Sequence, residues 1–411
     1  MLKNFLISLL SLVSVTCAEA QIMLVGAQND TLGVTNVLRW NANTGTQQAT
    51  VPTQSQGYVM GASVFDAVNG QYYIRDISSM HRVSFSPDTS DALNLQFDLG
   101  NAEIDMQTGK IFALTTTDRF DSSGMYIGSS LDFIQYNLAN NTETNLLTIT
   151  DAQGYIIDGS AYDSNHGTYY FVGVDTSQYY NLYKITNANT NPSFVKIPLT
   201  NRQFMPSSME YDNDNNVLYA LGQLVDTLTT SVVHVQIQKI DTVTGAMTLD
   251  GDFSQFPGLQ IGANTYDQAT HTMAFIAEDT ALGLWGYNTQ SHTLTALQLP
   301  TYDLSELEAD NTVYAAAKYG TVTQLTNQTS PLSFCAFPNP STEYLYLRLP
   351  ENIESTTFVV FDISGMQIAN GTLTREADFR IEVQTLPAGL YFVRGIANGQ
   401  LIEGKFTVGT R

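Results

Sequence analysis

The chain has 411 residues, of which 43% are hydrophobic and only 14% are charged, so it can bury a sizeable core and is not a disordered segment. Its 39 acidic residues outnumber its 17 basic ones, which gives a net charge of −22. A field of that sign repels phosphate backbones and attracts cations or basic ligands, which argues against a nucleic-acid-binding protein.

Residues 1–20 have the pattern of a secretory signal peptide. Lys3 precedes an apolar core at residues 5–15, and Ala18-Glu19-Ala20 forms an A-x-A cleavage site. We therefore expect this segment to be removed and the mature chain to begin at Gln21. No later stretch reaches the length of an apolar transmembrane helix.

The segment 21–325 contains a repeat. Each copy consists of an aromatic or aliphatic residue, an aspartate, a polar turn and a hydrophobic pair. The five copies begin at Phe65-Asp66, Ile104-Asp105, Tyr162-Asp163, Tyr211-Asp212 and Tyr266-Asp267. A repeat of about fifty residues with several short strands is typical of a β-propeller, in which each four-stranded blade covers its neighbours. We expect the aspartates to be structural and to cap the turn after the innermost strand.

The two ends of this segment are expected to form one composite blade. Residues 22–51 match the three outer strands of a repeat but lack the inner strand. A degenerate copy at Glu306-Leu307-Glu308 supplies that strand, so five repeats and the composite blade predict six blades. Residues 314–318 remain as an extra strand, which makes seven blades the alternative.

The loops between the second and third strands are predicted to meet at one mouth of the propeller. Binding residues tend to lie on such loops of a rigid scaffold. Aromatic faces beside carboxylates suit carbohydrate stacking, hydroxyl hydrogen bonds or a cationic ligand. The predicted ligand-binding residues are Asp118, Arg119, Asp121, Tyr126, Asp175, Tyr179, Tyr180, Asp226, Glu278 and Asp279.

No catalytic motif is recognisable in the sequence. The five histidines are scattered singly, and there is no G-x-S-x-G elbow, Walker loop or dinucleotide-binding fingerprint. Glu103, Glu210 and Glu306 stand at similar places before the repeat turn, where they could line the central channel and hold a cation or water.

One run of the sequence resembles the opening of a calcium loop. Residues 212–216 (DNDNN) place oxygens at the first, third and fifth positions, but an EF-hand also needs Gly at the sixth and Glu at the twelfth. Val217 and Gln223 occupy those positions, so we interpret the run as a hairpin turn, with calcium as the alternative. No other cofactor is expected.

The C-terminal residues resemble a known family. Pro338-Asn339-Pro340, residues 361–365 (FDISG) and residues 386–391 (LPAGLY) follow one another in order, and residues 404–408 (GKFTV) stand close to the end. Together they resemble the C-terminal sorting domain of the type IX secretion system of Bacteroidetes. The motif residues are Pro338, Asn339, Pro340, Asp362, Gly365, Leu386, Pro387, Gly389 and Lys405.

That resemblance implies a route out of the cell. The type IX machinery and its sorting peptidase would be partners, and the passenger would be released or attached to surface lipopolysaccharide. Short alternating strands in the same region predict a small immunoglobulin-like sandwich. The expected organisation is a signal peptide at 1–20, a propeller at 21–325, a linker at 326–336 and the sorting domain at 337–411.

These expectations define an all-β protein, with a β-propeller followed by a C-terminal sandwich, that is secreted or attached to the outer-membrane surface. The first functional hypothesis is recognition of a glycan or protein by the mouth loops. The alternatives are a carbohydrate-active hydrolase or lyase that uses carboxylates at the channel mouth, and a structural protein of the cell envelope. The lack of a recognisable catalytic constellation favours binding over catalysis.

Overall fold

The computed structural model describes residues 21–30, 32–55, 57–225, 232–300, 304, 306–319, 332–333, 335–337, 339–348, 355–361, 367–375, 379–397 and 400–409. The expected signal peptide lies outside these residues. The chain divides between Val322 and Thr323 into two compact units, which are described separately.

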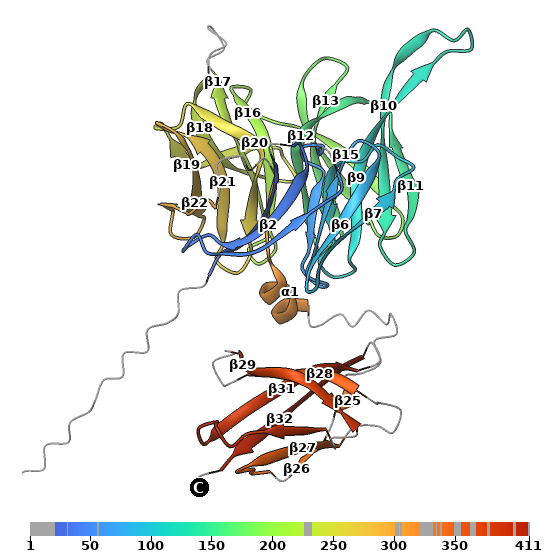
Figure 1. Ribbon diagram of the computed structural model, residues 1–411. Helices are drawn as coiled ribbons and strands as arrows, with labels where there is room; N and C mark the ends of the chain where they lie inside the picture. The colour runs from blue at the N-terminus through green and yellow to red at the C-terminus, as the bar shows by residue number, and fades with distance from the viewer. Residues whose placement is uncertain are drawn as a thin grey trace, which may run out of the picture. The chain divides into compact units, whose positions relative to one another are not determined.

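The first unit contains, in its described residues, six four-stranded antiparallel sheets (Figure 1). We number these blades from one to six in chain order and give their strands from the innermost outward. The first blade consists of β24 (Glu306–Ala309), β1 (Met23–Asn29), β2 (Thr35–Asn41) and β3 (Gln47–Pro52); the second of β4 (Ser63–Asp66), β5 (Gln71–Arg75), β6 (Ser79–Phe85) and β7 (Asp88–Asn94); the third of β8 (Gly100–Ile104), β9 (Lys110–Phe120), β10 (Tyr126–Asn137) and β11 (Thr142–Ile149). The fourth consists of β12 (Ala152–Asp163), β13 (Thr168–Asp175), β14 (Tyr180–Thr186) and β15 (Ser193–Pro198); the fifth of β16 (Phe204–Asp212), β17 (Val217–Val225), β18 (Val232–Ile240) and β19 (Met247–Phe253); the sixth of β20 (Gly258–Asp267), β21 (Thr272–Glu278), β22 (Leu282–Asn288) and β23 (Thr293–Ala296).

The six blades close into a ring, which makes this unit a β-propeller. The innermost strands contact one another in the order β24, β4, β8, β12, β16 and β20, and β20 contacts β24 again. Each pair of adjacent blades shares one buried apolar cluster. Between the third and fourth blades, for example, the rings of Phe112 and Tyr162 stack with centroids 5.2 Å apart. Each blade therefore buries its faces against its neighbours, as expected for repeated four-stranded units.

The ring is closed by pairing between the two ends of the propeller segment. Strand β24 pairs antiparallel with β1, with Ala309 opposite Leu24 and Glu306 opposite Ala27. The composite blade predicted from the sequence is confirmed by this register.

The extra strand predicted at residues 314–318 is wrong. These residues belong to the helix α1 (Thr312–Tyr319), which is the one helix among the described residues and is not long and apolar enough to cross a membrane. Asp310 caps its start by accepting the backbone N–H of Thr312 at 3.1 Å. A run of three alanines, which favour helix, follows in the middle of the segment.

The repeat aspartates are structural, as predicted. All five are buried, and each accepts backbone N–H groups of the turn that follows it; Asp66, for example, accepts from Val68 and Asn69 at 3.0 and 3.1 Å. In the run expected to be either a hairpin turn or a calcium loop, Asp212 accepts from Asp214 and Asn215 at 2.9 and 3.0 Å. The run therefore forms the expected hairpin turn, and calcium there stays an untested alternative.

The second unit is a sandwich of two sheets with one core between them. One sheet has the order β25-β32-β31-β28-β29 and the other β26-β27-β30, and the buried cluster takes side chains from both. Its strands are β25 (Leu332–Ser333), β26 (Cys335–Phe337), β27 (Tyr344–Arg348), β28 (Ser355–Phe361), β29 (Gln367–Thr374), β30 (Arg380–Glu382), β31 (Gly389–Ala397) and β32 (Gln400–Val408). Sheet pairing begins at Leu332, within the segment assigned to a linker by the sequence. The immunoglobulin-like connectivity stays a prediction.

Candidate functional site

The antiparallel blades give the propeller two different mouths. Turns between the first and second and between the third and fourth strands lie at one end, which we call the turn mouth. Loops between the second and third strands and the links between blades lie at the other end, which we call the loop mouth. The repeat aspartates belong to the turn mouth, and the nine predicted ligand-binding residues that the structure describes belong to the loop mouth by their place in the blades.

A chain of hydrogen bonds links successive blades at the turn mouth. From the third blade to the sixth, the residue after the repeat aspartate donates its backbone N–H to the side-chain oxygen of the equivalent residue in the next blade. The donors and acceptors are Met106 to Ser164 at 3.1 Å, Ser164 to Asn213 at 2.9 Å, Asn213 to Gln268 at 3.0 Å, and Gln268 to Asn311 at 2.9 Å. The sequence reasoning missed this chain, although its signal was a polar residue directly after an aspartate in four successive blades, at Asp163, Asp212, Asp267 and Asp310.

Helix α1 lies across the turn mouth (Figure 1). Ala315 packs into the core shared by the first and second blades. On the opposite side of the ring, Lys318 donates to the carbonyl of Asn213 at 2.8 Å and the Tyr319 hydroxyl donates to Asn165 Oδ1 at 3.3 Å. Because these partners belong to blades on both sides of a six-membered ring, the helix covers the turn mouth of the channel.

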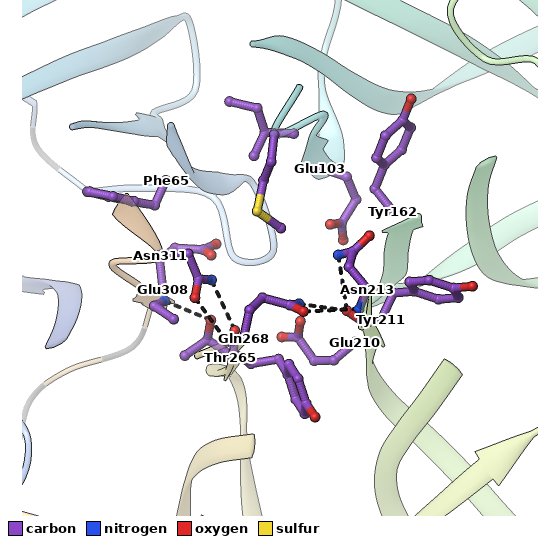
Figure 2. Close-up of a pocket in the computed structure, with 14 residues that line it drawn as sticks. Phe65, Glu103, Tyr162, Glu210, Tyr211, Asn213, Thr265, Gln268, Glu308 and Asn311 are labelled. Carbon is purple, nitrogen blue, oxygen red and sulfur yellow. Dashed lines mark hydrogen bonds between the residues drawn. The ribbon is translucent and has the colours of Figure 1, made fainter. Parts of the chain in front are cut away.

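A cavity of about 60 Å³ lies in the channel near this mouth (Figure 2). Glu103, Glu210 and Glu308 line it from the third, fifth and first blades. Ser160 donates to Glu103 at 2.8 Å and Ser63 donates to Glu308 at 3.0 Å. Such a volume holds a few water molecules.

Burial controls the charge of these channel carboxyls. It raises the pKa of Glu103 to about 8, and burial together with the neighbouring acids raises the pKa of Glu210 and Glu308 well above their ordinary range. Among the described residues, no group of three or more His, Cys, Asp or Glu side chains is placed to hold a metal ion. With a pKa of about 8, the Glu103 carboxyl carries a proton at neutral pH.

Two other acids extend this channel network. Burial raises the pKa of Asp158 to about 7, and the side-chain amide of Asn264 in the sixth blade donates to its carboxyl. Glu306, which the sequence placed with Glu103 and Glu210, is buried beside the cavity and accepts from Gly61 N–H at 3.1 Å and from the Ser63 hydroxyl at 3.0 Å. The residue that fills the expected position in the lining is Glu308.

At the loop mouth, three predicted residues converge on one pocket. Asp175, Tyr179 and Tyr180 line a hollow of about 420 Å³ between the fourth blade and its link to the fifth, which we call the fourth-blade pocket. Lys196 and Arg202 also line it. The Arg202 guanidinium lies 4.2 Å from the centroid of the Tyr179 ring, and Lys196 Nζ lies 3.6 Å from Asp175 Oδ2. Aromatic, acidic and basic groups thus share one concave surface.

Asp175 also shapes the loop of this pocket. Its carboxylate accepts the backbone N–H groups of Ser177 and Tyr179 at 2.9 and 3.1 Å. The bond from Tyr179 holds the pKa of Asp175 below its usual range, so the carboxylate is charged at neutral pH.

The other predicted residues lie apart from this pocket. Asp118, Arg119, Asp121 and Tyr126 are exposed on the hairpin of β9 and β10. Asp121 caps the turn of that hairpin by accepting from Ser123 and Met125 at 2.8 and 2.9 Å.

The last three predicted ligand-binding residues also lie away from the fourth-blade pocket or outside the described residues. Glu278 and Asp279 are exposed at the turn between β21 and β22 of the sixth blade. Asp226 lies outside the described residues. The structure therefore does not bring all ten residues into one site.

Most of the exposed large hydrophobic side chains of the described propeller lie at the loop mouth. Examples are Leu32, Ile77, Phe120, Tyr126 and Tyr179. The turn mouth, in contrast, is polar and hydrogen-bonded. This asymmetry marks the loop mouth as the face on which partners are expected.

Comparison with known proteins characterises the two units differently. Residues 335–408 match the family described as secretion system C-terminal sorting domain. Karilysin from Tannerella forsythia is 40% identical over 82 residues, which are 18% of this chain and 17% of karilysin. The resemblance of the C-terminal residues to a sorting domain is thereby confirmed, and it implies export by the type IX machinery and attachment at the cell surface.

The described part of that sorting domain includes several predicted motif residues. The side-chain oxygen of Asn339 accepts the backbone N–H of Thr407 in β32 at 2.8 Å, which ties the first block to the last strand. Pro387 accepts the Tyr391 hydroxyl at 2.7 Å within the LPAGLY block. Pro338, Asp362 and Gly365 lie outside the described residues, whereas Pro340, Leu386, Gly389 and Lys405 are within them.

The propeller is similar to solved structures in fold. TolB from Acinetobacter baumannii matches with a TM-score of 0.51 and 8% identity, over 70% of this chain and 66% of that chain. An oligogalacturonate lyase in complex with manganese matches with a TM-score of 0.45 and 10% identity, over 67% of this chain and 78% of that chain. The first likeness confirms the β-propeller fold, and neither brings a ligand or an activity to this chain.

Proposed function

We propose that this protein is a secreted or surface-displayed β-propeller that binds a glycan in the fourth-blade pocket. The observation that supports this function is the convergence of Tyr179, Tyr180 and Asp175 with Arg202 on one hollow. Tyrosine rings offer flat apolar surfaces to sugar rings, and the polar groups beside them can hydrogen-bond hydroxyls.

The chemistry of the pocket suits a glycan with anionic groups. Lys196 and Arg202 supply positive charge, while Asn201 and Gln178 supply amide groups that both donate and accept. Arg202 lies against Tyr179, which fixes the guanidinium on one wall. A carboxylate or sulfate on the sugar would bind there, with its ring on Tyr180.

A carbohydrate-active enzyme is the second candidate. It is favoured by Glu103 and Asp158, whose pKa values of about 8 and about 7 lie near those of general acids that work at neutral pH. Against it, the cavity next to Glu103 has only about 60 Å³, and the turn mouth beyond it is covered by α1. Substrate would therefore have to reach these carboxyls from the loop mouth.

One experiment separates the two functions. The full chain is incubated with bacterial, plant and algal polysaccharides, including neutral and uronate- or sulfate-bearing polymers, and bound and released sugars are analysed by mass spectrometry. We expect retention of an anionic polymer at unchanged length. Shorter or unsaturated fragments would overturn binding in favour of catalysis.

Variants locate the binding site. Tyr180→Ala and Arg202→Ala should each weaken retention at least about tenfold, since each removes a contact in a concave site. Phe392→Ala, which removes an exposed aromatic ring from the sorting domain, is the matched control and should bind as the unaltered chain does. Equal retention by all three variants would place the ligand elsewhere.

A further inference from the structure

The hairpin of β9 and β10 is longer than the blade to which it belongs. Strand β8 pairs with β9 no further than Leu114, and β11 pairs with β10 only from Leu131 onward. Beyond these points, residues 115–120 and 126–130 pair with each other and, among the described residues, with no third strand. We call residues 115–130 the arm, which projects at the upper right of Figure 1. Both of its outer edges present backbone donors and acceptors for a further strand.

The arm carries large apolar side chains at its end. Phe120, Met125, Tyr126 and Ile127 have exposed fractions of 59%, 68%, 55% and 55%. The rings of Phe120 and Tyr126 meet edge to face, with centroids 5.9 Å apart. Exposed apolar residues are usually scattered singly on soluble proteins, whereas a contiguous group marks an interaction site.

One face of β9 continues from the propeller core into the arm. Phe112 and Leu114 are buried between the third and fourth blades. Because side chains alternate along a strand, they share their face with Asp118 and Phe120 farther out. Ser129 on β10 donates to Asp118 at 3.0 Å, so the polar group on this face is already oriented. The strand face that neighbouring blades bury in the propeller is thus exposed in the arm, where it carries Thr116, Asp118 and Phe120.

Charge distinguishes between the partners that could cover the arm. Asp118 and Asp121 stand beside a single base, Arg119, and the whole chain has a net charge of −22. The same acidic pair on the arm of a second copy is repelled, as is an anionic lipid surface that approaches the arm. A basic polypeptide is attracted.

We propose that the arm is a docking site for a basic polypeptide segment, which adds a strand to a free edge and covers Phe120 and Tyr126. In such β-augmentation, backbone hydrogen bonds supply affinity and alternate side chains supply specificity. The arm is distinct from the fourth-blade pocket, and this inference does not depend on the glycan proposed above.

A strand-forming peptide tests the proposal directly. The probe is a labelled peptide of alternating valine and lysine, and the control peptide alternates valine and glutamate. With the full chain we expect binding of the lysine peptide by fluorescence anisotropy, weakening as salt is raised, and none of the glutamate peptide. Hydrogen exchange measured by mass spectrometry should slow within residues 115–130 when the lysine peptide is bound.

Matched variants separate the arm from a general attraction to an acidic protein. Phe120→Ser combined with Tyr126→Ser should weaken binding at least about tenfold, because the covered rings are lost. Val243→Ser removes a side chain that is 78% exposed at the turn mouth and should leave binding unchanged. Circular dichroism of both variants should match that of the unaltered chain, since the substituted side chains are at the surface.

Three results would overturn the proposal. The first is equal binding of the lysine peptide by the double variant, and the second is exchange protection that lies outside the arm. The third is an arm-dependent association with something else, seen either as dimers in light scattering or as binding to lipid vesicles. In that case the arm would serve a second copy or a membrane and not a basic polypeptide.

Discussion

The two mouths of this propeller are made by the same six blades and differ in their physical character. At the turn mouth, buried aspartates and the hydrogen-bond chain from Met106 to Asn311 hold the blades together, and helix α1 covers the channel. At the loop mouth, exposed rings, the arm and the fourth-blade pocket leave much surface open.

The difference shows which residues of the chain build the ring and which form the candidate binding sites. The aspartates that recur in every copy cap the turns of the blades, and the residues directly after them join neighbouring blades from the third blade onward. Residues that differ from blade to blade lie in the loops and create one pocket at the fourth blade and one arm at the third. Recognition therefore depends on the irregular segments, on a scaffold that the regular ones hold rigid.

The strongest test of the comparison uses two aspartates that cap turns at opposite mouths. Asp212→Ala should lower the free energy of unfolding by about 3 kcal/mol, because it strands buried donors such as the Tyr266 hydroxyl, 2.8 Å away. Asp121→Ala, at the exposed tip of the arm, should change the midpoint of denaturant unfolding little. Circular dichroism during urea unfolding measures both.

Asp212→Asn serves as the control for this pair. It keeps one acceptor oxygen and should recover part of the loss caused by Asp212→Ala. If the alanine variants at Asp212 and Asp121 unfold at the same urea concentration, the two mouths do not differ in their structural role.

The pH dependence of stability tests the channel that joins the mouths. Burial raises the pKa of Glu103 from 4.5 to about 8, so the folded state holds a proton that the unfolded chain releases. The stability from this group is fully present below pH 4.5 and is lost as pH rises to about 8, with a slope of at most about 1.4 kcal/mol per pH unit. Glu103→Gln should flatten the decline across that window.

The control for this prediction is a carboxylate at the loop mouth. Glu278→Gln removes an exposed acid and should leave the slope of unfolding free energy against pH as it is in the unaltered chain. A Glu103→Gln variant that loses stability with rising pH as steeply as the unaltered chain would contradict a protonated channel.

The smallest effect is expected at the helix that covers the turn mouth. Lys318→Ala should lower the free energy of unfolding by about 1 kcal/mol or less, because the ion pair with Asp214 is partly exposed. Hydrogen exchange should nevertheless quicken in residues 312–319. Unchanged exchange there would mean that apolar contacts such as those of Ala315 hold the helix without the ion pair.

The repeat could be read from the sequence because its physical cause is local. An aspartate that caps the turn after it needs only its own neighbours, so the five copies were recognisable, and the missing inner strand at residues 22–51 revealed the composite blade. The helix at Thr312–Tyr319 was misread as a strand because Val313 and Tyr314 stand where the repeat has its hydrophobic pair. Its cap, Asp310, was the overlooked sixth aspartate.

The candidate sites could be predicted only in part. Asp175, Tyr179 and Tyr180 lie close together in sequence, so their convergence was foreseeable. Arg202 reaches the same pocket through the link between blades, which the repeat pattern does not describe. The hydrogen-bond chain at the turn mouth joins residues about fifty positions apart, a distance over which only the folded ring brings them together.

The pairing of β24 with β1 also determines when the propeller ring can close as the chain emerges. Its partner residues, Leu24 and Ala309, stand at opposite ends of the propeller segment. A polypeptide that emerges amino terminus first therefore holds an unfinished ring, with the edge of β1 unprotected, until almost the whole segment has emerged. The sorting domain begins only a short stretch later, at residue 335. The propeller ring can thus close only shortly before the sorting domain itself emerges.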